Sequence, residues 1–383
     1  MKFGLYAAVA AACVFSLGNS GPAFNRIEAT AGQGPGSLAI ADVNHDGHAD
    51  ILVANTTGRT LTVLLGDGHG HFHPAPGVPC PTGPSPNDLA LADFNGDGNL
   101  DVAIANTETP EISILLGDGK GGFKPSPRSP FTTESHPHVH GVAAADFNGD
   151  GKIDIVTDSW GRNQILLLPG DGAGNLIPPG RPFNTGKRPY QRLRAADFNK
   201  DGKPDVVTTD LDGNAVSVLL GDGRGGFEDA AGSPFPAGVF PWAVAVDDLN
   251  RDGNLDLAVL PYDRDIADAK QLGVTVLLGD GKGGFRPMTG LPFSLSGCRG
   301  PDRVATGDVN GDGYRDIAVT CAQNNKLMLF LGSSGGAFRV SSVDVPTGWS
   351  GLAIADLNGD GRDDIVVSNN TGSAPGVTIL LSK

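Results

Sequence analysis

The chain repeats one nine-residue pattern, D-x-N-x-D-G-x-x-D, seven times, and every copy is complete. The copies begin at Asp42, Asp93, Asp146, Asp197, Asp248, Asp308 and Asp356. Successive copies start roughly 50 residues apart, and the longest interval runs from Asp248 to Asp308. A near-constant period of this length indicates an array of one supersecondary unit, because such a unit buries its apolar surface only against its neighbours.

Each copy carries oxygen donors at the spacing of a loop that wraps a hard cation. Side-chain oxygens stand at positions 1, 3, 5 and 9, position 7 offers its backbone carbonyl, and Gly at position 6 permits a left-handed turn. No soft ligand occupies positions 1, 3, 5 or 9, so zinc and copper are disfavoured and up to seven Ca²⁺ ions are expected. The predicted metal-binding residues are Asp42, Asn44, Asp46, His48, Asp50, Asp93, Asn95, Asp97, Asn99, Asp101, Asp146, Asn148, Asp150, Lys152, Asp154, Asp197, Asn199, Asp201, Lys203, Asp205, Asp248, Asn250, Asp252, Asn254, Asp256, Asp308, Asn310, Asp312, Tyr314, Asp316, Asp356, Asn358, Asp360, Arg362 and Asp364.

The loop begins like an EF-hand but does not end like one. Position 12 of an EF-hand is a bidentate Glu, whereas here it is Val53, Ile104, Thr157, Thr208, Val259, Val319 or Val367. Strand-forming residues follow position 9, as in residues 101–105, so each loop joins two strands. One isolated copy would fit a polar hairpin equally well, and it is the repetition that favours a metal loop.

The charge balance agrees with bound cations. The chain has 43 acidic residues against 28 Lys and Arg, a net charge of −15. Three Asp in each of seven loops supply 21 of those acids, and seven divalent ions would offset almost the whole excess. Without metal the carboxylates of one loop repel each other. Such an acidic chain is a poor partner for nucleic acid.

Four strands are expected in each repeat. An apolar strand precedes the Asp loop, two more follow it, and Gly-Asp-Gly-x-Gly-Gly-Phe then forms a tight hairpin to a fourth, for example at residues 117–123. A phosphate-binding interpretation of this glycine-rich segment fails because Pro-rich sequence, not a helix, follows it. Four antiparallel strands in about 50 residues describe one blade, so the sequence predicts an all-β, seven-bladed propeller.

The two ends of the chain predict how the ring closes. The last repeat stops after its third strand, at residues 377–381, and an orphan strand stands near residues 24–30. Phe24 precedes Asp42 by the same interval that separates Phe338 from Asp356. We therefore expect the N-terminal strand to complete the last blade and remove its open edge.

These motifs resemble those of the FG-GAP/VCBS repeat family, which also occurs in integrin α-subunits. Residues 93–98 read DFNGDG and residues 115–123 read LLGDGKGGF, and the likeness extends over residues 22–383. The resemblance implies a calcium-stabilised seven-bladed propeller, usually extracellular. It does not imply one function, because the fold serves adhesion, sugar binding and some enzymes.

Residues 1–20 are predicted to be a signal peptide and residues 21–383 a single propeller domain. Lys2 precedes a short apolar stretch at residues 5–17, and small residues at 18 and 20 permit cleavage. That stretch is short for a membrane span, and no other segment is apolar enough to cross. We expect a secreted, cell-surface or periplasmic protein; lipidation at Cys13 is the alternative.

Three cysteines remain after this segment. Cys80 stands where other repeats have Phe, so it is expected to act as a small buried apolar residue. Cys298 and Cys321 flank the first hairpin of the sixth blade. A disulfide between them and a pair of free thiols are both open interpretations.

A ligand is expected on the face opposite the Asp loops, where aromatic, His and Arg residues gather. The candidate ligand-binding residues are His138, His140, Trp160, Tyr190, Arg192, Arg194, Trp242 and Tyr262. The residue six places before each first Asp should ring the channel mouth, and a long charged loop around residues 261–273 should lie over the same face. Two alternatives remain: aromatic residues that seal the blade junctions, and a transition-metal site at residues 136–140.

The leading hypothesis is a non-catalytic binding or adhesion module for a glycan, matrix component or surface protein, acting as a monomer. The sequence predicts neither a Gly-x-Ser-x-Gly elbow that leads from a strand into a helix nor a His-Glu-x-x-His helix. The alternative is an enzyme of polysaccharide-lyase type, in which Tyr190, His138 or His140 serves as base and Arg residues neutralise an acidic sugar. A purely structural scaffold is the third hypothesis.

Overall fold

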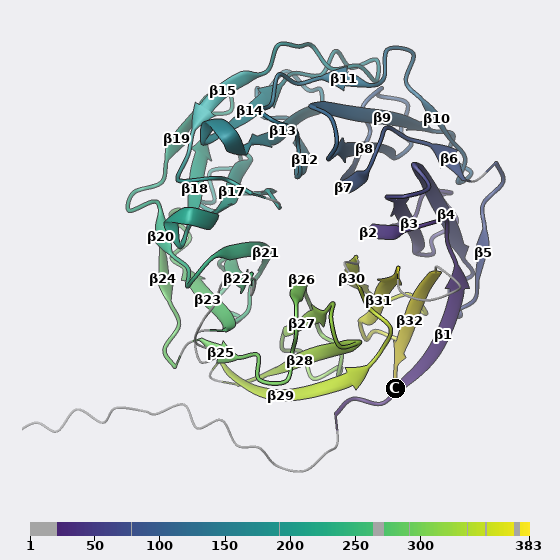
Figure 1. Ribbon diagram of the computed structural model, residues 1–383, viewed down its shortest axis with the longest axis vertical. Coiled ribbons are helices and arrows are strands. Elements are labelled where there is room, and N and C mark those ends of the chain that lie inside the picture. The colour runs from purple at the N-terminus through teal and green to yellow at the C-terminus, as the bar shows by residue number, and fades with distance from the viewer. Residues whose placement is uncertain are drawn as a thin grey trace, which may run out of the picture.

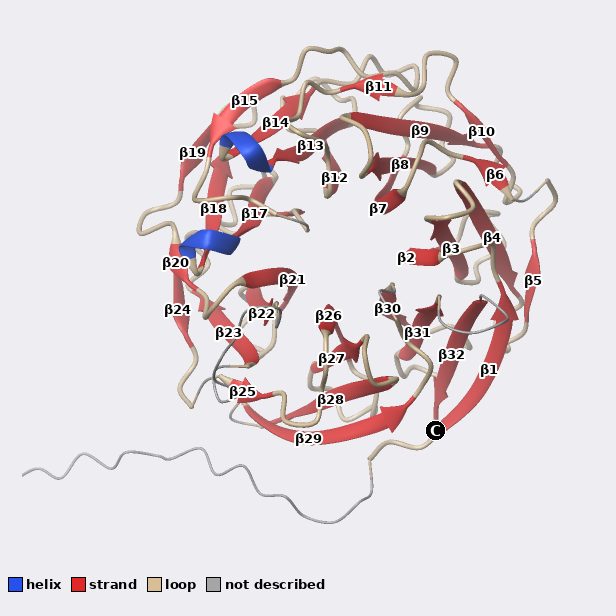
Figure 2. Cartoon of the chain, in the orientation of Figure 1, coloured by secondary structure: helices blue, strands red, loops and turns tan. Residues whose placement is uncertain are grey.

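In the computed structural model each repeat forms one four-stranded antiparallel sheet, and seven such sheets stand as blades around one axis (Figures 1 and 2). This confirms the predicted all-β, seven-bladed propeller. The described helices, η1 (Trp160–Arg162) and η2 (Leu211–Gly213), are single turns, and neither has the length and apolar character that a membrane crossing requires. The structure describes residues 21–77, 79–190, 192–262, 272–290, 292–334, 336–348, 351–370 and 376–383. The predicted signal peptide, most of the loop around 261–273, Gln191, Trp349 and Ser350 lie outside these ranges.

Each blade runs from an inner first strand to an outer fourth strand (Figure 1). The first strands are β2 (Pro35–Ala41), β7 (Pro86–Ala92), β12 (Val142–Ala145), β16 (Arg194–Ala196), β21 (Pro241–Asp247), β26 (Pro301–Gly307) and β30 (Leu352–Ala355). The second strands are β3 (Asp50–Asn55), β8 (Asp101–Asn106), β13 (Asp154–Ser159), β17 (Asp205–Asp210), β22 (Asp256–Pro261), β27 (Asp316–Cys321) and β31 (Asp364–Asn369). Every second strand therefore begins at the ninth residue of an Asp loop.

The outer half of each blade consists of a third strand and a fourth strand. The third strands are β4 (Thr60–Gly66), β9 (Glu111–Gly117), β14 (Gln164–Leu168), β18 (Ala215–Gly221), β23 (Gly273–Gly279), β28 (Lys326–Ser333) and β32 (Gly376–Ser382). The fourth strands are β5 (Phe72–Pro74), β10 (Phe123–Pro125), β15 (Arg181–Asn184), β19 (Phe227–Asp229), β24 (Phe285–Pro287), β29 (Ala337–Asp344) and β1 (Phe24–Thr30). Four short strands pair with third strands beyond these: β6 (Cys80–Pro81), β11 (Phe131–Thr132), β20 (Phe235–Pro236) and β25 (Phe293–Ser294).

The apolar core lies between neighbouring blades. Second and third strands such as β8 and β9 are buried along nearly their whole length, as expected for strands covered on both faces. The buried clusters cross the blade junctions, and one of them joins Val377 and Ile379 of the last blade to Ile51 and Leu64 of the first. The stability of each blade therefore depends on its two neighbours.

The N-terminal strand closes the ring as predicted. β1 pairs with β32 in antiparallel register, with Phe24 opposite Ser382. In the preceding blade Phe338 stands opposite Gly332 in the same way. Phe24 thus takes the place of the hairpin phenylalanine, and β1 covers the outer edge of β32.

Cys80 occupies the position of a phenylalanine in the neighbouring blade. It pairs with Leu61 of its third strand, as Phe131 pairs with Ile112. Cys80 is 3% exposed, which confirms the prediction that it acts as a small buried apolar residue.

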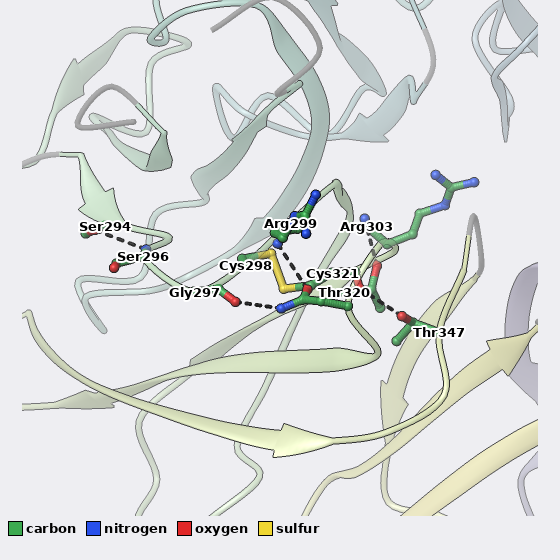
Figure 3. The surroundings of a disulfide bond; sticks show 10 residues. Ser294, Ser296, Gly297, Cys298, Arg299, Arg303, Thr320, Cys321 and Thr347 are labelled. Atoms are coloured by element: carbon green, nitrogen blue, oxygen red, sulfur yellow. Dashed lines mark hydrogen bonds between the residues drawn. A yellow bond between two sulfur atoms is a disulfide. The ribbon is translucent and has the colours of Figure 1, made fainter. Parts of the chain in front are cut away.

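Cys298 and Cys321 form a disulfide, which resolves the alternative left open by the sequence. Figure 3 shows the bond between the segment that leads into β26 and the end of β27. Thr347 donates a hydrogen bond of 2.9 Å to the carbonyl oxygen of Cys321, so a third segment is held at the same point. The bond fixes the entry of blade 6 to its second strand.

Replacing both cysteines, Cys298→Ala with Cys321→Ala, is expected to lower the free energy of unfolding by about 3 kcal/mol, the loop-closure value for a separation of this order. The two residues are 23 positions apart in sequence. Urea unfolding measures the loss. Reductant should lower the stability of the wild type and leave the double variant unchanged; equal urea midpoints for the reduced and oxidised wild type would contradict the prediction.

Candidate functional site

Six of the eight predicted ligand-binding residues lie side by side across blades 3, 4 and 5. This aromatic strip consists of His138, His140, Trp160, Tyr190, Trp242 and Tyr262. Ring centroids are separated by 4.7 Å for His138–His140, 5.8 Å for His138–Trp160, 4.2 Å for His140–Tyr190, 5.6 Å for Trp160–Tyr190, 5.0 Å for Tyr190–Trp242 and 4.2 Å for Trp242–Tyr262.

The strip belongs to the turns and connections at the end of the ring opposite the Asp loops. Trp160 begins η1, one of the two short helices that Figure 2 shows in blue on neighbouring blades. Trp242 is 8% exposed and His140 is 2% exposed, so these two form the base of the strip. Trp160, Tyr190 and Tyr262 are half-buried and carry its accessible surface. The buried rings of the strip thus pack between neighbouring blades, and its half-buried rings present accessible edges.

Arg188 extends the strip, although sequence reasoning did not single it out among the Arg residues of this face. Its guanidinium carbon lies 5.1 Å from the Trp160 ring centroid and 5.5 Å from that of Tyr190. Its Nη1 donates to Asp212 at 3.3 Å. Arg188 has a positive φ of 58°, so strand spacing does not relate it to Tyr190, and the sequence carried no clear signal for this contact.

A chain of hydrogen bonds runs through the histidine end of the strip. Asp158 Oδ2 lies 3.2 Å from His140 Nδ1, and His140 Nε2 lies 3.2 Å from His138 Nε2. Asp158 Oδ1 also accepts the backbone N–H of His140 at 2.8 Å. Burial, and the nearby His140, lower the pKa of His138. A neutral His138 next to an oriented His140 is a group that could accept a proton.

The other two predicted residues, Arg192 and Arg194, do not join the strip. Nη1 of Arg192 donates to Asp88 Oδ1 at 2.5 Å, and both side chains are almost fully buried. Nη1 of Arg194 lies 3.8 Å from the other oxygen of Asp88. Both Arg residues belong to blade 4 and Asp88 to blade 2, so they meet in the central channel.

A cavity in the central channel involves the residue next to the predicted ring position. In six of the seven blades it is lined by the residue five places before the first Asp of the loop: Ser37, Asp88, Arg192, Ala243, Arg303 and Gly351. Residues at the predicted position, six places before the first Asp, contact one another across blade junctions. Asn87 donates to the carbonyl oxygen of His140 at 3.0 Å, and Trp242 Nε1 to Asp302 at 3.4 Å.

The Asp loops lie at the opposite end and hold their own backbone with their side chains. In blade 2, Asp93 Oδ2 accepts from the backbone N–H of Gly98 at 2.8 Å, and Asn95 Oδ1 from that of Asp97 at 2.9 Å. Asp97 Oδ1 accepts from the backbone N–H of Asn99 at 2.8 Å. The side chains at positions 1, 3 and 5 are thereby turned into the loop.

The ninth-position Asp has a structural role that sequence reasoning missed. Asp101 accepts the backbone N–H of Phe94 at 2.9 Å and that of Gly117 at 2.8 Å, so it joins the Asp loop to the glycine-rich hairpin. The same pair of bonds is made by Asp50, Asp154, Asp205, Asp256, Asp316 and Asp364. Burial, with further contributions from Asp97 and Asp93, raises the pKa of Asp101 to about 6.

These loops suit a hard divalent cation by their donor chemistry. Within the described residues, three or more His, Cys, Asp or Glu side chains nowhere converge as a preformed metal centre. Each loop nevertheless holds three carboxylates, an amide oxygen and a backbone carbonyl within nine residues. Burial is the main cause of the raised pKa of the ninth Asp, and the other two carboxylates of the loop add to it; a nearby cation would favour the charged form.

Asp210 is a buried carboxyl group beside the strip, at the end of β17. Its backbone pairs with Pro189, next to Tyr190, and its Oδ2 accepts from the Ser217 hydroxyl at 2.6 Å. Burial raises the pKa of Asp210 to about 7. Asn55 ends the corresponding strand of blade 1 and bonds Thr62 at the same spacing.

Asp210→Asn is expected to stabilise the protein at alkaline pH. The folded-state pKa is raised, so the contribution of Asp210 is present at low pH and is lost as the pH rises through about 7. At pH 8.5 the variant should be more stable by about 2–4 kcal/mol, and by less than half as much at pH 5, because the loss begins above the unfolded-state pKa. Urea unfolding at both pH values measures it. The reciprocal change, Asn55→Asp, should make blade 1 pH-sensitive; a gain from Asp210→Asn that is equal at both pH values would contradict the prediction.

Comparison with known proteins places the repeats in a family. The family model for the FG-GAP-like repeat matches residues 42–104, 93–157, 155–208, 197–259 and 308–367. Mouse cartilage acidic protein 1 is 32% identical over 113 residues, which cover 29% of this chain and 17% of that protein. Integrin alpha-PS5 of Drosophila melanogaster is 32% identical over 128 residues, 32% of this chain and 13% of that protein. The chain thus spans less than a fifth of the length of either relative.

Solved structures share the architecture at low sequence identity. Virginiamycin B lyase from Staphylococcus aureus has a TM-score of 0.57 at 14% identity, covering 94% of this chain and 100% of the lyase. The periplasmic gluconolactonase of Pseudomonas aeruginosa has a TM-score of 0.57 at 18% identity, covering 81% of this chain and 85% of that enzyme. At such identities the likeness concerns the fold alone.

Proposed function

Because the chain belongs to the FG-GAP-like repeat family, we propose that it is an exported, calcium-stabilised binding module without catalytic activity. Its ligand is a glycan or a matrix or surface protein, bound on the face opposite the Asp loops. The observation that carries the proposal is the aromatic strip, in which six rings from three blades make continuous contact. Aromatic surface with polar edges suits both sugars and protein ligands.

The exposed part of the strip has the chemistry of a recognition surface. Trp160, Tyr190 and Tyr262 present half-buried rings, and Arg188 adds a cation above two of them. Rigid rings lose little conformational entropy on binding, so they contribute large contact area at low cost. Stacking of Trp242 on Tyr262, with an interplanar angle of 14°, fixes that ring before a ligand arrives.

Calcium supports this surface from the opposite end of the ring. The ions would be held by positions 1, 3, 5 and 9 and the position-7 carbonyl, and when bound they neutralise the carboxylates of each loop. The ninth Asp links each ion site to its blade, because its carboxylate accepts hydrogen bonds from both the Asp loop and the last residue of the third strand. Export is supported by the Cys298–Cys321 disulfide, since such bonds persist in oxidising compartments.

Replacing Tyr190 is expected to weaken ligand retention at least about tenfold, the effect of losing a central aromatic contact. Purified protein with calcium is applied to a panel of neutral and acidic polysaccharides and matrix proteins, and retention is recorded together with new unsaturated or reducing ends. Tyr314→Ala is the matched control, because Tyr314 lies in an Asp loop under Arg251, and alanine keeps the backbone carbonyl that this position would offer to calcium. Tyr190→Ala should lose retention and Tyr314→Ala should keep it; equal retention by the two variants would remove the strip as the binding surface.

The enzyme alternative is favoured by one observation, the chain of contacts from Asp158 through His140 to His138. A lyase could use His138 as base. The cations expected to neutralise an acidic sugar, Arg192 and Arg194, lie in the channel against Asp88 instead. New unsaturated ends in the panel that disappear in His138→Ala would put this alternative first, and their absence leaves the binding module.

A further inference from the structure

The central channel holds more positive than negative side chains. Guanidinium groups of Arg192, Arg194 and Arg303 accompany the carboxylates of Asp88 and Asp302. Nη1 of Arg303 donates to Asp302 Oδ1 at 2.5 Å. Two close ion pairs leave Arg194 as a third cation, with its side chain 40% exposed and 3.8 Å from Asp88, beside a cavity of about 40 Å³. The net positive charge of this largely enclosed site is unfavourable unless an anion or solvent balances it.

Several guanidinium N–H groups in the channel have no acceptor. Arg192 is 3% exposed, and neither its Nε nor its Nη2 has a hydrogen-bond partner in the described part of the chain. The same holds for Nε of Arg303. Burial, followed by repulsion from Arg192, lowers the pKa of Arg303 to about 10. The guanidinium N–H groups without acceptors and the excess positive charge therefore lie in the same part of the central channel.

We propose that this cavity binds a small monovalent anion, such as chloride or formate, between Arg192 and Arg303. A monovalent anion balances the excess positive charge and accepts hydrogen bonds from the free N–H groups. A water molecule can accept such hydrogen bonds but does not balance the charge. A volume of about 40 Å³ admits a few atoms and excludes a sugar ring or a gluconate ion. The anion would join blade 4 to blade 6 across the axis, independently of any ligand on the aromatic strip.

The test compares anions at constant ionic strength, so that general screening is unchanged. The full-length protein, with calcium supplied as gluconate, is melted in sodium gluconate and in mixtures that replace it with sodium chloride. With a dissociation constant of about 1 mM, 100 mM chloride should raise the melting temperature by about 3–4 °C along a saturating curve. An identical melting temperature in chloride and gluconate overturns the proposal.

Arg303→Gln removes the excess charge and should abolish the chloride effect. Arg286→Gln is the matched control, because Arg286 is exposed on the outer strand β24 and should keep the effect. A chloride effect that survives in Arg303→Gln places the ion elsewhere and overturns the proposal. If Arg303→Gln fails to fold, wild-type crystals soaked in bromide decide: an anomalous peak between Arg192 and Arg303 supports the site, and density for water alone overturns it.

Discussion

Removing calcium from the purified protein is expected to lower its melting temperature by more than about 10 °C. Each loop carries three carboxylates within nine residues, and its ninth Asp is fully or almost fully buried. An ion bound only by the folded state at 100 times its dissociation constant adds about 2.7 kcal/mol. Because the chain has seven such loops, calcium removal should lower the melting temperature more than any other single change of conditions. Without the ion, the carboxylates of one loop repel each other, and the ninth one stays buried.

Scanning calorimetry with excess chelator, followed by restoring calcium, measures the effect and its reversibility. Asp150→Asn supplies the control within one loop. Asp150 also accepts a backbone N–H bond from Lys152 at 3.0 Å, which asparagine can replace. The variant should be less stable than the wild type in calcium and equal to it in chelator. An unchanged wild-type melting temperature in chelator would contradict seven structural ions.

The fold was predictable because its determinants are local and repeated. Phe24 and Phe338 precede the next Asp loop by the same number of residues. This spacing predicted that Phe24 belongs to a fourth strand of the last blade, and the structure pairs it with Ser382. The position of Cys80 followed in the same way from its alignment with the phenylalanines. Positions counted from an Asp loop correspond from blade to blade as long as the strands are regular. Each of these predictions therefore required only the pattern of a single repeat.

The residues that line the channel cavity were not predicted, for a physical reason. The first strands are irregular just where they reach the channel, with register shifts between Pro35 and Leu38 and between Pro301 and Val304. A bulge changes which side chains face inward, and counting along the sequence does not show it. The aromatic strip was predicted because most of its residues lie in turns and connections at one end of the ring, where large side chains interrupt the repeated pattern; Trp242 lies at the start of β21. Arg192 and Asp88 are 104 positions apart in sequence, so no local sequence pattern indicates that they pair.

Asp88→Ala is expected to lower the free energy of unfolding by about 3–5 kcal/mol, because it leaves a buried guanidinium without its partner. Asp88 is 4% exposed, and its second oxygen also accepts from the backbone N–H of Val142 at 3.4 Å. The carboxylate therefore holds blades 2, 3 and 4 together at the axis. Urea unfolding in calcium measures the loss.

Glu28→Ala is the control, because the Arg26–Glu28 pair is just as short, at 2.6 Å, but both side chains are about half exposed. Water screens such a pair, so the loss should stay below about 1 kcal/mol. A second variant separates charge from packing: Arg192→Met added to Asp88→Ala removes the unpaired cation and should recover part of the loss. If the double variant is instead less stable by the sum of the two single losses, burial of an unpaired charge is not the cause, and the channel residues stabilise the ring by packing alone.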